Sequence, residues 1–136
     1  HDLSMLSEFT KPINDSVFKM MRRNLPGPFT FILEANNNIP RIFQSKKKTV
    51  GIRIPDQPII TDIVREFGSP IMTTSLVDEE DEMGNYLTDP EEIHERYKDK
   101  VDIVIDGGLG ENVASTVVDC TDNEILIVRQ GKGKLE

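Results

Sequence analysis

The stretch NLPGPFTFIL, residues 24 to 33, joins two different hydrophobic patterns through two prolines that flank a glycine. Before it, residues 18–25 carry apolar side chains at helical spacing, and after it FTFIL is rich in the aromatic and branched residues typical of strands. Proline fixes φ and pushes the preceding residue toward extended geometry, so we predict a stiff helix-to-strand turn with Leu25 and Gly27 extended. The turn would present Thr30 at the mouth of a strand.

The composition is that of one ordinary globular domain. The 136 residues are 37% hydrophobic and 29% charged, and no apolar run approaches the roughly 20 residues that would span a bilayer, so we expect no membrane partner. Cys120 is the only cysteine and no secretory leader is visible, which favours a reduced, cytoplasmic setting. The chain begins at His1 without an initiator methionine, and we expect a single domain over residues 1–136 that lacks its N-terminal segment.

The charge distribution argues against one class of function. A net charge of -8 disfavours strong nonspecific nucleic-acid binding, which depends on lysine and arginine at phosphates. Acidic residues concentrate in DEEDE, residues 78–82, and in DPEEIHERY, residues 89–97. Such runs are typical of solvated loops and helix faces. DEEDE lacks the glycine and the spacing of a calcium loop, so we predict no metal site there.

The hydrophobic periodicity predicts a mixed fold of class α/β (α+β), in which the last two strands form a hairpin across residues 121–124. Asp89 is the expected cap of the last helix, and Gly68 ends the one before it. The predicted helices cover residues 3–9, 15–24, 57–67 and 90–98. The predicted strands cover residues 29–34, 49–54, 70–76, 101–106, 115–120 and 124–130.

Strand alternation in TVGIRI, residues 49–54, places Gly51 and Arg53 on one face. The missing side chain at Gly51 leaves room beside the guanidinium, and Arg53 could hold a carboxylate or phosphate through paired hydrogen bonds. The alternative for Arg53 is a structural ion pair with a neighbouring acid. In IMTTSL, residues 71–76, Thr74 and Ser75 point in opposite directions; such hydroxyls could serve a ligand or merely line a sheet edge.

The last third offers a similar arrangement. DGGLGENVAS, residues 106–115, is a glycine-containing connection that delivers Ser115 into a strand, but it lacks the GK[ST] ending of a P-loop. Arg129 ends EILIVR and could bind a ligand or a terminal backbone group. His94 lies in an acidic helix and is expected to face solvent. No Ser/His/Asp, Cys/His or paired-carboxylate constellation is present, so we assign no catalytic residue.

Taken in order, these motifs resemble the YrdC/YciO proteins, which include the threonylcarbamoyl-AMP synthases. The resemblance covers essentially the whole chain, and its branch is closest to YciO because TTSLV is followed by an acidic loop, DPEEI and VDIVIDGG. The motifs that carry it are PGPFT at 26–30, TVGIRIPD at 49–56, PIMTTS at 70–75, STVVD at 115–119 and ILIVRQGKG at 125–133.

The resemblance implies a twisted, mixed and mostly antiparallel sheet with flanking helices and a concave nucleotide-binding face. It implies that Thr30, Arg53 and Ser115 contact threonine, with Arg53 on the carboxylate. It implies that Thr74, Ser75 and Arg129 approach ATP, with Mg2+ bound through the ATP phosphates. Such a synthase uses ATP, threonine and bicarbonate, and its product serves tRNA threonylcarbamoyladenosine modification, with RNA or tRNA-modification proteins as possible partners.

Two departures from the synthase pattern leave a second function open. The synthases continue the hydroxyl motif as S-A-N, whereas here Ser75 is followed by Leu76 and Val77. No counterpart of the family's upstream lysine/arginine segment precedes His1. The alternative is therefore a YciO-type nucleotide- or RNA-binding protein without full synthase activity, and the sequence does not decide whether the chain is an enzyme.

Overall fold

The computed structural model describes residues 1–43, 46–122 and 124–136, and within them the chain divides into two compact units. The first unit comprises His1–Pro70 and Ala114–Glu136, and the second comprises Ile71–Val113. Each unit is described by itself. The expectation of one domain that lacks its N-terminal segment stays a prediction.

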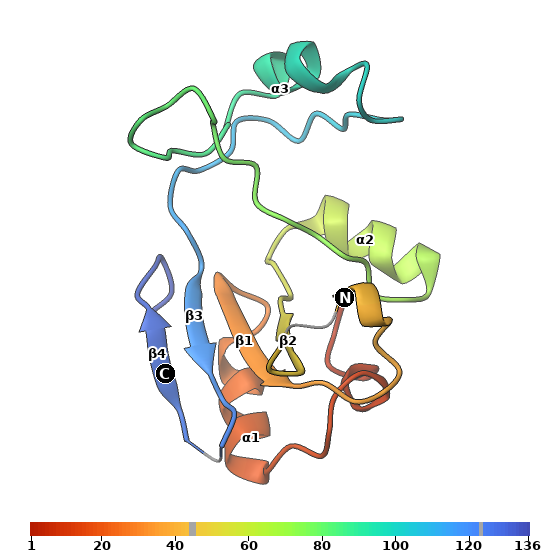
Figure 1. Cartoon of the computed structure of the whole chain (residues 1–136), viewed down its shortest axis with the longest axis vertical. Helices are drawn as coiled ribbons and strands as arrows, with labels where there is room; N and C mark the ends of the chain where they lie inside the picture. The colour runs from red at the N-terminus through yellow and green to blue at the C-terminus, as the bar shows by residue number, and fades with distance from the viewer. Residues whose placement is uncertain (44–45, 123) are drawn as a thin grey trace. The chain divides into compact units, whose positions relative to one another are not determined.

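The first unit is built on a mixed four-stranded sheet with the order β2-β1-β3-β4 (Figure 1). β1 pairs antiparallel with β2 and parallel with β3, and β3 pairs antiparallel with β4. The predicted mixed, mostly antiparallel sheet is therefore confirmed, as is the final hairpin. The strands are β1 (Phe29–Glu34), β2 (Thr49–Ile52), β3 (Thr116–Asp119) and β4 (Leu126–Arg129).

The helix before the PGP turn is α1 (Asp15–Asn24), as predicted. It begins where the Asn14 side chain accepts a hydrogen bond from the Val17 amide at 2.9 Å, which satisfies one of the free donors of the first turn. It ends at Leu25, whose φ of -117° and ψ of 140° are extended, as the following proline requires. The helix-to-strand turn read from the sequence is confirmed at this residue.

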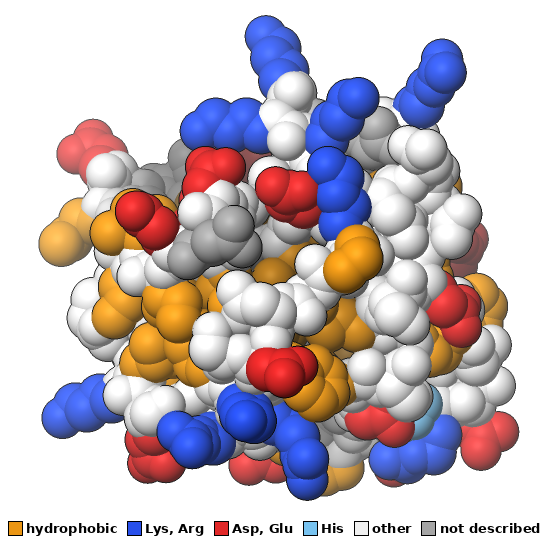
Figure 2. All heavy atoms as spheres, turned by 90° about the horizontal axis from the view of Figure 1, so that it is seen from below, with side chains coloured by type: hydrophobic (Ala, Val, Ile, Leu, Met, Phe, Trp, Pro, Cys, Tyr) orange, Lys and Arg blue, Asp and Glu red, His pale blue; other side chains and the backbone are white. Residues whose placement is uncertain are grey.

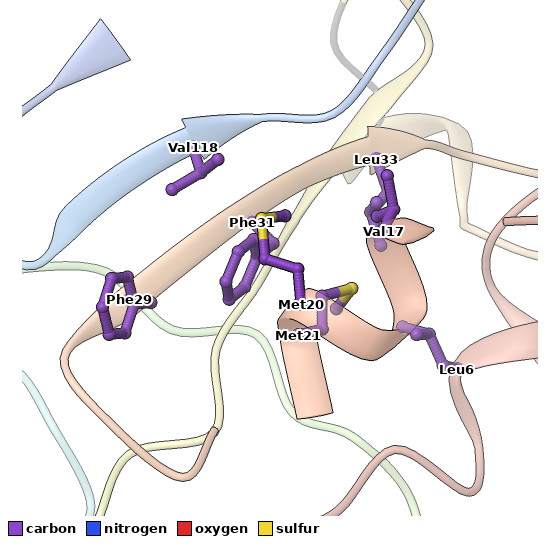
Figure 3. Close-up of a cluster of buried hydrophobic side chains, with 8 residues drawn as sticks. All are labelled: Leu6, Val17, Met20, Met21, Phe29, Phe31, Leu33 and Val118. Atoms are coloured by element: carbon purple, nitrogen blue, oxygen red, sulfur yellow. The ribbon is translucent and has the colours of Figure 1, made fainter. Parts of the chain in front are cut away.

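The core of the first unit lies between α1 and one face of the sheet (Figure 3). Phe31 and Val118 are completely buried, and Phe31 stacks on Phe29 with ring centroids 5.8 Å apart. The odd-numbered residues of β1 are buried, whereas Thr30, Ile32 and Glu34 are only partly buried because successive side chains of a strand point to opposite faces. The core residues are Leu6, Val17, Met20, Met21, Phe29, Phe31, Leu33 and Val118.

Residues near the C-terminus form hydrogen bonds with the first residue of β3 and the last residue of α1. The buried Thr116 hydroxyl donates to the Gly133 carbonyl at 2.7 Å and accepts from the Gly131 amide at 3.0 Å. The Glu136 amide donates to the Asn24 side chain at 3.0 Å, and the Asn24 amide group donates to the Glu136 carbonyl at 3.2 Å. These bonds fix the tail against both α1 and β3.

The remaining helices of the first unit are shorter or more exposed. The predicted helix over residues 3–9 is a single 3-10 turn, η1 (Leu6–Glu8), and a second such turn is η2 (Arg41–Phe43). α2 (Pro58–Phe67) ends at Gly68, whose φ of 76° suits glycine, as predicted. None of the described helices is long and apolar enough to cross a membrane.

The second unit holds α3 (Pro90–Tyr97), which begins at the predicted cap Asp89. Arg96 of α3 forms ion pairs with Asp78 at 2.8 Å, with Glu80 at 3.4 Å and with Glu92 at 2.6 Å. The Asp78 pKa is lowered chiefly by its hydrogen bond from Arg96. The acidic DEEDE run is thus a loop attached to α3 by one arginine.

The predicted strands over residues 70–76 and 101–106 are wrong, because neither segment forms a strand in the structure. Near the first, only Val77 and Tyr86 form an isolated antiparallel bridge. A strand needs a neighbouring backbone to pair with, and in the described part of the second unit these segments have one only at Leu76, whose carbonyl accepts a hydrogen bond from the Leu87 amide at 2.9 Å. The alternating pattern was compatible with a strand but carried no information on a partner.

β4 lies at an edge of the sheet, and all four of its residues are exposed. Three of them are apolar: Leu126, Ile127 and Val128. Seen from below, apolar side chains lie at the surface among charged ones (Figure 2). Among the described residues of the first unit, no strand pairs with the outer edge of β4.

The packing of Gly133 on Phe29 gives a prediction about stability. A Cβ added at Gly133 would lie 2.5 to 2.8 Å from three ring carbons of Phe29, and the ring is held by its stacking on Phe31. We expect Gly133→Ala to lower the free energy of unfolding by about 1–3 kcal/mol in chemical denaturation. Gly110→Ala is the matched control, since its Cβ would approach Thr88 no closer than 3.5 Å. Equal stability of both variants would contradict this packing.

Candidate functional site

The candidate site lies on the sheet face opposite α1. Residues directly opposite one another in paired strands point to the same face. Thr30 pairs with Val117, and Val117 pairs with Arg129, so these three residues point to one face of the sheet. The odd-numbered residues of β1 point to the other face, toward the core. Gly51 lies opposite Ile32, on the same face as Thr30. The structure therefore brings parts of four of the sequence motifs onto one surface.

Thr30, Ser115 and Arg129 form a connected polar group on this face. The Thr30 and Ser115 hydroxyl oxygens are 2.8 Å apart, although the residues are 85 positions apart in the sequence. Arg129 donates to the Ser115 carbonyl from Nε at 3.1 Å and from Nη2 at 2.9 Å. Its Nη2 also donates to the Ser115 hydroxyl at 3.2 Å. Arg129 thus binds a backbone group, the alternative that the sequence left open, and a predicted site hydroxyl as well.

Arg53 follows β2 on the side of Gly51, as the alternation predicts. The next residue, Ile54, is buried with 4% exposure, whereas Arg53 is exposed. Arg53 makes no hydrogen bond or ion pair with any residue that the structure describes, so the structural ion pair considered from the sequence is not formed there. A guanidinium without a partner among the described residues can bind a carboxylate or a phosphate.

Gly51 contributes by the absence of a side chain. A Cβ at this position would lie 3.2 Å from the Thr30 methyl group, which is closer than side chains normally approach. Glycine therefore lets the Thr30 methyl group lie over β2 while the Thr30 hydroxyl faces Ser115. The room beside Arg53 that the sequence predicted is partly filled by this methyl group.

Thr74 and Ser75 belong to the second unit, whereas Thr30, Ser115 and Arg129 belong to the first. Both are exposed, and the Thr74 hydroxyl reaches only the Ser75 carbonyl, at 3.5 Å. They do not lie on a paired strand, so the facing directions predicted from alternation do not apply. Their proposed role at a nucleotide stays a prediction. His94, in the same unit, has 57% of its side chain exposed, as expected.

Asp119 is a residue of this face that the sequence reasoning did not single out. It lies opposite Ile32 and accepts hydrogen bonds from the Thr121 amide at 2.9 Å and the Thr121 hydroxyl at 2.7 Å. These bonds stabilise the charged form and lower the Asp119 pKa. Asp119 therefore places a negative charge on this face, opposite Ile32 and two residues along β1 from Thr30. The sequence motif STVVD contains Asp119 and was the signal that could have identified it.

A cavity of about 300 Å³ opens elsewhere on the first unit. Its lining includes Val17 and Leu33 of the core side but none of Thr30, Arg53, Ser115 or Arg129. Lys11 and Glu34 form an ion pair at 3.0 Å on its wall. Cys120 also lines it, and burial raises the pKa of its thiol to about 11, with a smaller contribution from Asp119. The cavity carries no nucleophile that is activated near neutral pH.

Comparison with known proteins identifies the relatives of this chain. Residues 1–131 match the Sua5/YciO/YrdC family model, described as "Telomere recombination". The uncharacterized protein YciO of Escherichia coli K12 is 38% identical over 136 residues, which are 99% of this chain and 65% of that protein. The threonylcarbamoyl-AMP synthase of Bacillus subtilis is 31% identical over 138 residues, covering 96% of this chain and 37% of the synthase.

Solved structures agree with the sequence comparison. The crystal structure of E. coli YciO matches with a TM-score of 0.89 and 37% identity, over 98% of this chain and 64% of that one. The structure of P. abyssi Sua5 complexed with L-threonine matches with a TM-score of 0.83 and 26% identity, over 96% of this chain and 38% of that one. The chain thus spans about two thirds of the length of YciO.

The Cys120 thiol gives a prediction that depends on no ligand. Its pKa of about 11, against an ordinary 9.0, leaves about a hundredfold less thiolate at pH 8. We expect iodoacetamide to alkylate it about a hundredfold more slowly than an exposed thiol, with the rate rising up to pH 11. The control is Cys120→Ser combined with Ser7→Cys, since Ser7 is exposed. Comparable rates for the two thiols, measured by mass spectrometry, would refute the buried environment.

Proposed function

The chain belongs to the Sua5/YciO/YrdC family, and on that premise we propose that it is a threonylcarbamoyl-AMP synthase-like protein that uses ATP, threonine and bicarbonate. Its product would feed the threonylcarbamoyladenosine modification of tRNA. The single observation that carries the proposal is the exposed guanidinium of Arg53, which has no partner among the described residues, in the same unit as the hydrogen-bonded Thr30 and Ser115. Because the chain spans only part of its relatives, activity, substrates and partners are all proposals.

Threonine fits this face chemically. Its carboxylate suits the paired donors of Arg53, and its ammonium and hydroxyl groups can bond to hydroxyl oxygens such as those of Thr30 and Ser115. Support comes from P. abyssi Sua5, a structural relative that was solved with L-threonine bound. Asp119 adds a nearby negative charge that is compatible with an ammonium group.

The proposed reaction needs positioning more than a protein nucleophile. The amino group of threonine forms a carbamate with bicarbonate or dissolved carbon dioxide, and a carbamate oxygen attacks the α-phosphorus of ATP. The bond to the β-phosphate oxygen breaks, pyrophosphate leaves, and threonylcarbamoyl-AMP remains. Arginines and hydroxyl groups lower the repulsion between the two anions and hold them in line.

The nucleotide side of the proposal rests on fewer contacts. The resemblance implies Arg129, Thr74 and Ser75 as contacts, and all three are exposed. Cationic and hydroxyl donors suit phosphate oxygens. Magnesium would enter bound to the phosphates of ATP, where it neutralises their charge; among the described residues, no group of three His, Cys, Asp or Glu side chains is placed to hold it.

A second candidate is a YciO-type nucleotide- or RNA-binding protein without full synthase activity. The observation that favours it is Val77, an apolar residue where the synthase motif S-A-N has asparagine. Val77 bridges Tyr86 in the second unit and is 42% exposed, so its side chain is accessible but offers no hydrogen bond. One contact to a nucleotide would then be missing.

The first test measures pyrophosphate release by the longest natural form of the protein. With ATP, magnesium and bicarbonate, we expect release only when L-threonine is present. Arg53→Lys should raise the threonine concentration needed for half-maximal release about tenfold, because the paired donors are lost although the charge stays. Arg22→Lys is the control, since Arg22 is an exposed arginine on α1. Release without threonine, or no release at all, would reject the synthase.

The second test asks whether the side chain at position 77 faces the nucleotide. We expect Val77→Asn to tighten ATP binding by about threefold to tenfold in calorimetric titration, because an amide can donate to a phosphate oxygen. The control is Val77→Ala, which shortens the side chain without adding a donor. Unchanged binding in Val77→Asn, with the fold intact, would show that the side chain does not face the nucleotide.

A further inference from the structure

We propose that Arg129 is a positioning residue, which fixes the Ser115 and Thr30 hydroxyl groups so that Thr30 presents its proton to a ligand on the Arg53 face. This inference rests on the proposed function for the identity of the ligand. It gives Arg129 a different role from the nucleotide contact that the resemblance implies, since Arg129 would act through Ser115 and Thr30 rather than on the substrate.

The contacts of Arg129 are those of a residue that holds another one in place. Three donor contacts run to Ser115, two to its carbonyl oxygen and one to its hydroxyl oxygen, at 2.9 to 3.2 Å. The guanidinium fork can make these contacts together because Nε and Nη2 lie in one plane. Val117 pairs with Arg129 across the β3–β4 ladder, so the backbone already sets the side chain on this face.

The positive charge of Arg129 influences which of the two hydroxyl groups, Ser115 or Thr30, donates the hydrogen bond between them. A serine hydroxyl has one proton and two acceptor lone pairs. When a cation donates to its oxygen, the hydroxyl becomes a stronger donor, because consecutive hydrogen bonds polarise one another. Ser115 therefore donates to Thr30 across the 2.8 Å contact, and the Thr30 proton remains available for an acceptor outside the protein.

Gly51 leaves room for the other branch of Thr30. The Thr30 methyl group lies 3.2 Å from the place where a Gly51 Cβ would be, so it occupies space that a side chain at this position would contest. The hydroxyl branch is within hydrogen-bond distance of Ser115. Because threonine is β-branched and stiff at χ1, we expect this hydrogen bond to hold Thr30 in one rotamer. An acceptor such as a carboxylate would then meet a donor of fixed direction beside Arg53.

The decisive experiment needs no ligand. Three-bond couplings from the Thr30 Cγ2 atom to its backbone nitrogen and carbonyl carbon report its χ1 rotamer in solution. We expect values of a single rotamer in the wild type and averaged values in both Arg129→Met and Ser115→Ala, which break the chain at different points. Arg22→Met is the control, and backbone amide spectra verify that every variant is folded. Wild-type couplings in both test variants would overturn the inference.

A second measurement asks whether Arg129 acts through Thr30. We expect Arg129→Met to weaken L-threonine binding about tenfold, but less than twofold in a Thr30→Val background. Because L-threonine carries no net charge, losing a distant positive charge alone changes its affinity little. A tenfold loss in both backgrounds would mean direct contact and would overturn the positioning role. Failure of the wild type to bind L-threonine would reject the proposed function, whereas the couplings would still decide the role of Arg129.

Discussion

The burial of Phe31 is the constraint on which the rest of the first unit depends. Phe31 is fully buried against α1 residues and Val118, so β1 cannot slip by one position without exposing it. A one-residue shift would move every side chain of the strand to the opposite face. The apolar packing on one side therefore decides which residues form the polar surface on the other. Thr30 faces Ser115 because Phe29 and Phe31 are held in the core.

Local chemistry explains what could be predicted from the sequence. The turn at Leu25, the caps Asp89 and Gly68, and the four strands of the first unit follow from proline and glycine geometry and from alternation. Apart from the final hairpin, the strand partners could not be deduced in this way. The segments 70–76 and 101–106 have strand patterns, yet among the described residues only Leu76 has a neighbouring backbone partner, the Leu87 amide. The alternation of apolar and polar residues indicates which side chains a segment could bury. Strand pairing depends instead on parts of the chain that are distant in sequence.

The same distinction applies to the candidate site. The residue types on the face were predicted: an arginine, two hydroxyls and a glycine. Their connections were not, because the contact between Thr30 and Ser115 joins residues 85 positions apart, and Arg129 meets Ser115 only through the β3–β4 register. The family resemblance provided roles for individual residues. The structure adds that Arg129 donates hydrogen bonds to the Ser115 carbonyl of the protein itself.

The parallel pairing of β1 with β3 also has a consequence for the order of folding. The chain between them contains the whole second unit, so Phe29 and its partner Thr116 close a much longer loop than the antiparallel pair β1–β2 does. Loop closure costs more entropy as the loop lengthens, and distant contacts form more slowly than local ones. The Thr30–Ser115 contact can form only after this closure. We therefore expect the β1–β2 pair to form before the polar face, which would make ligand binding a marker of completed folding.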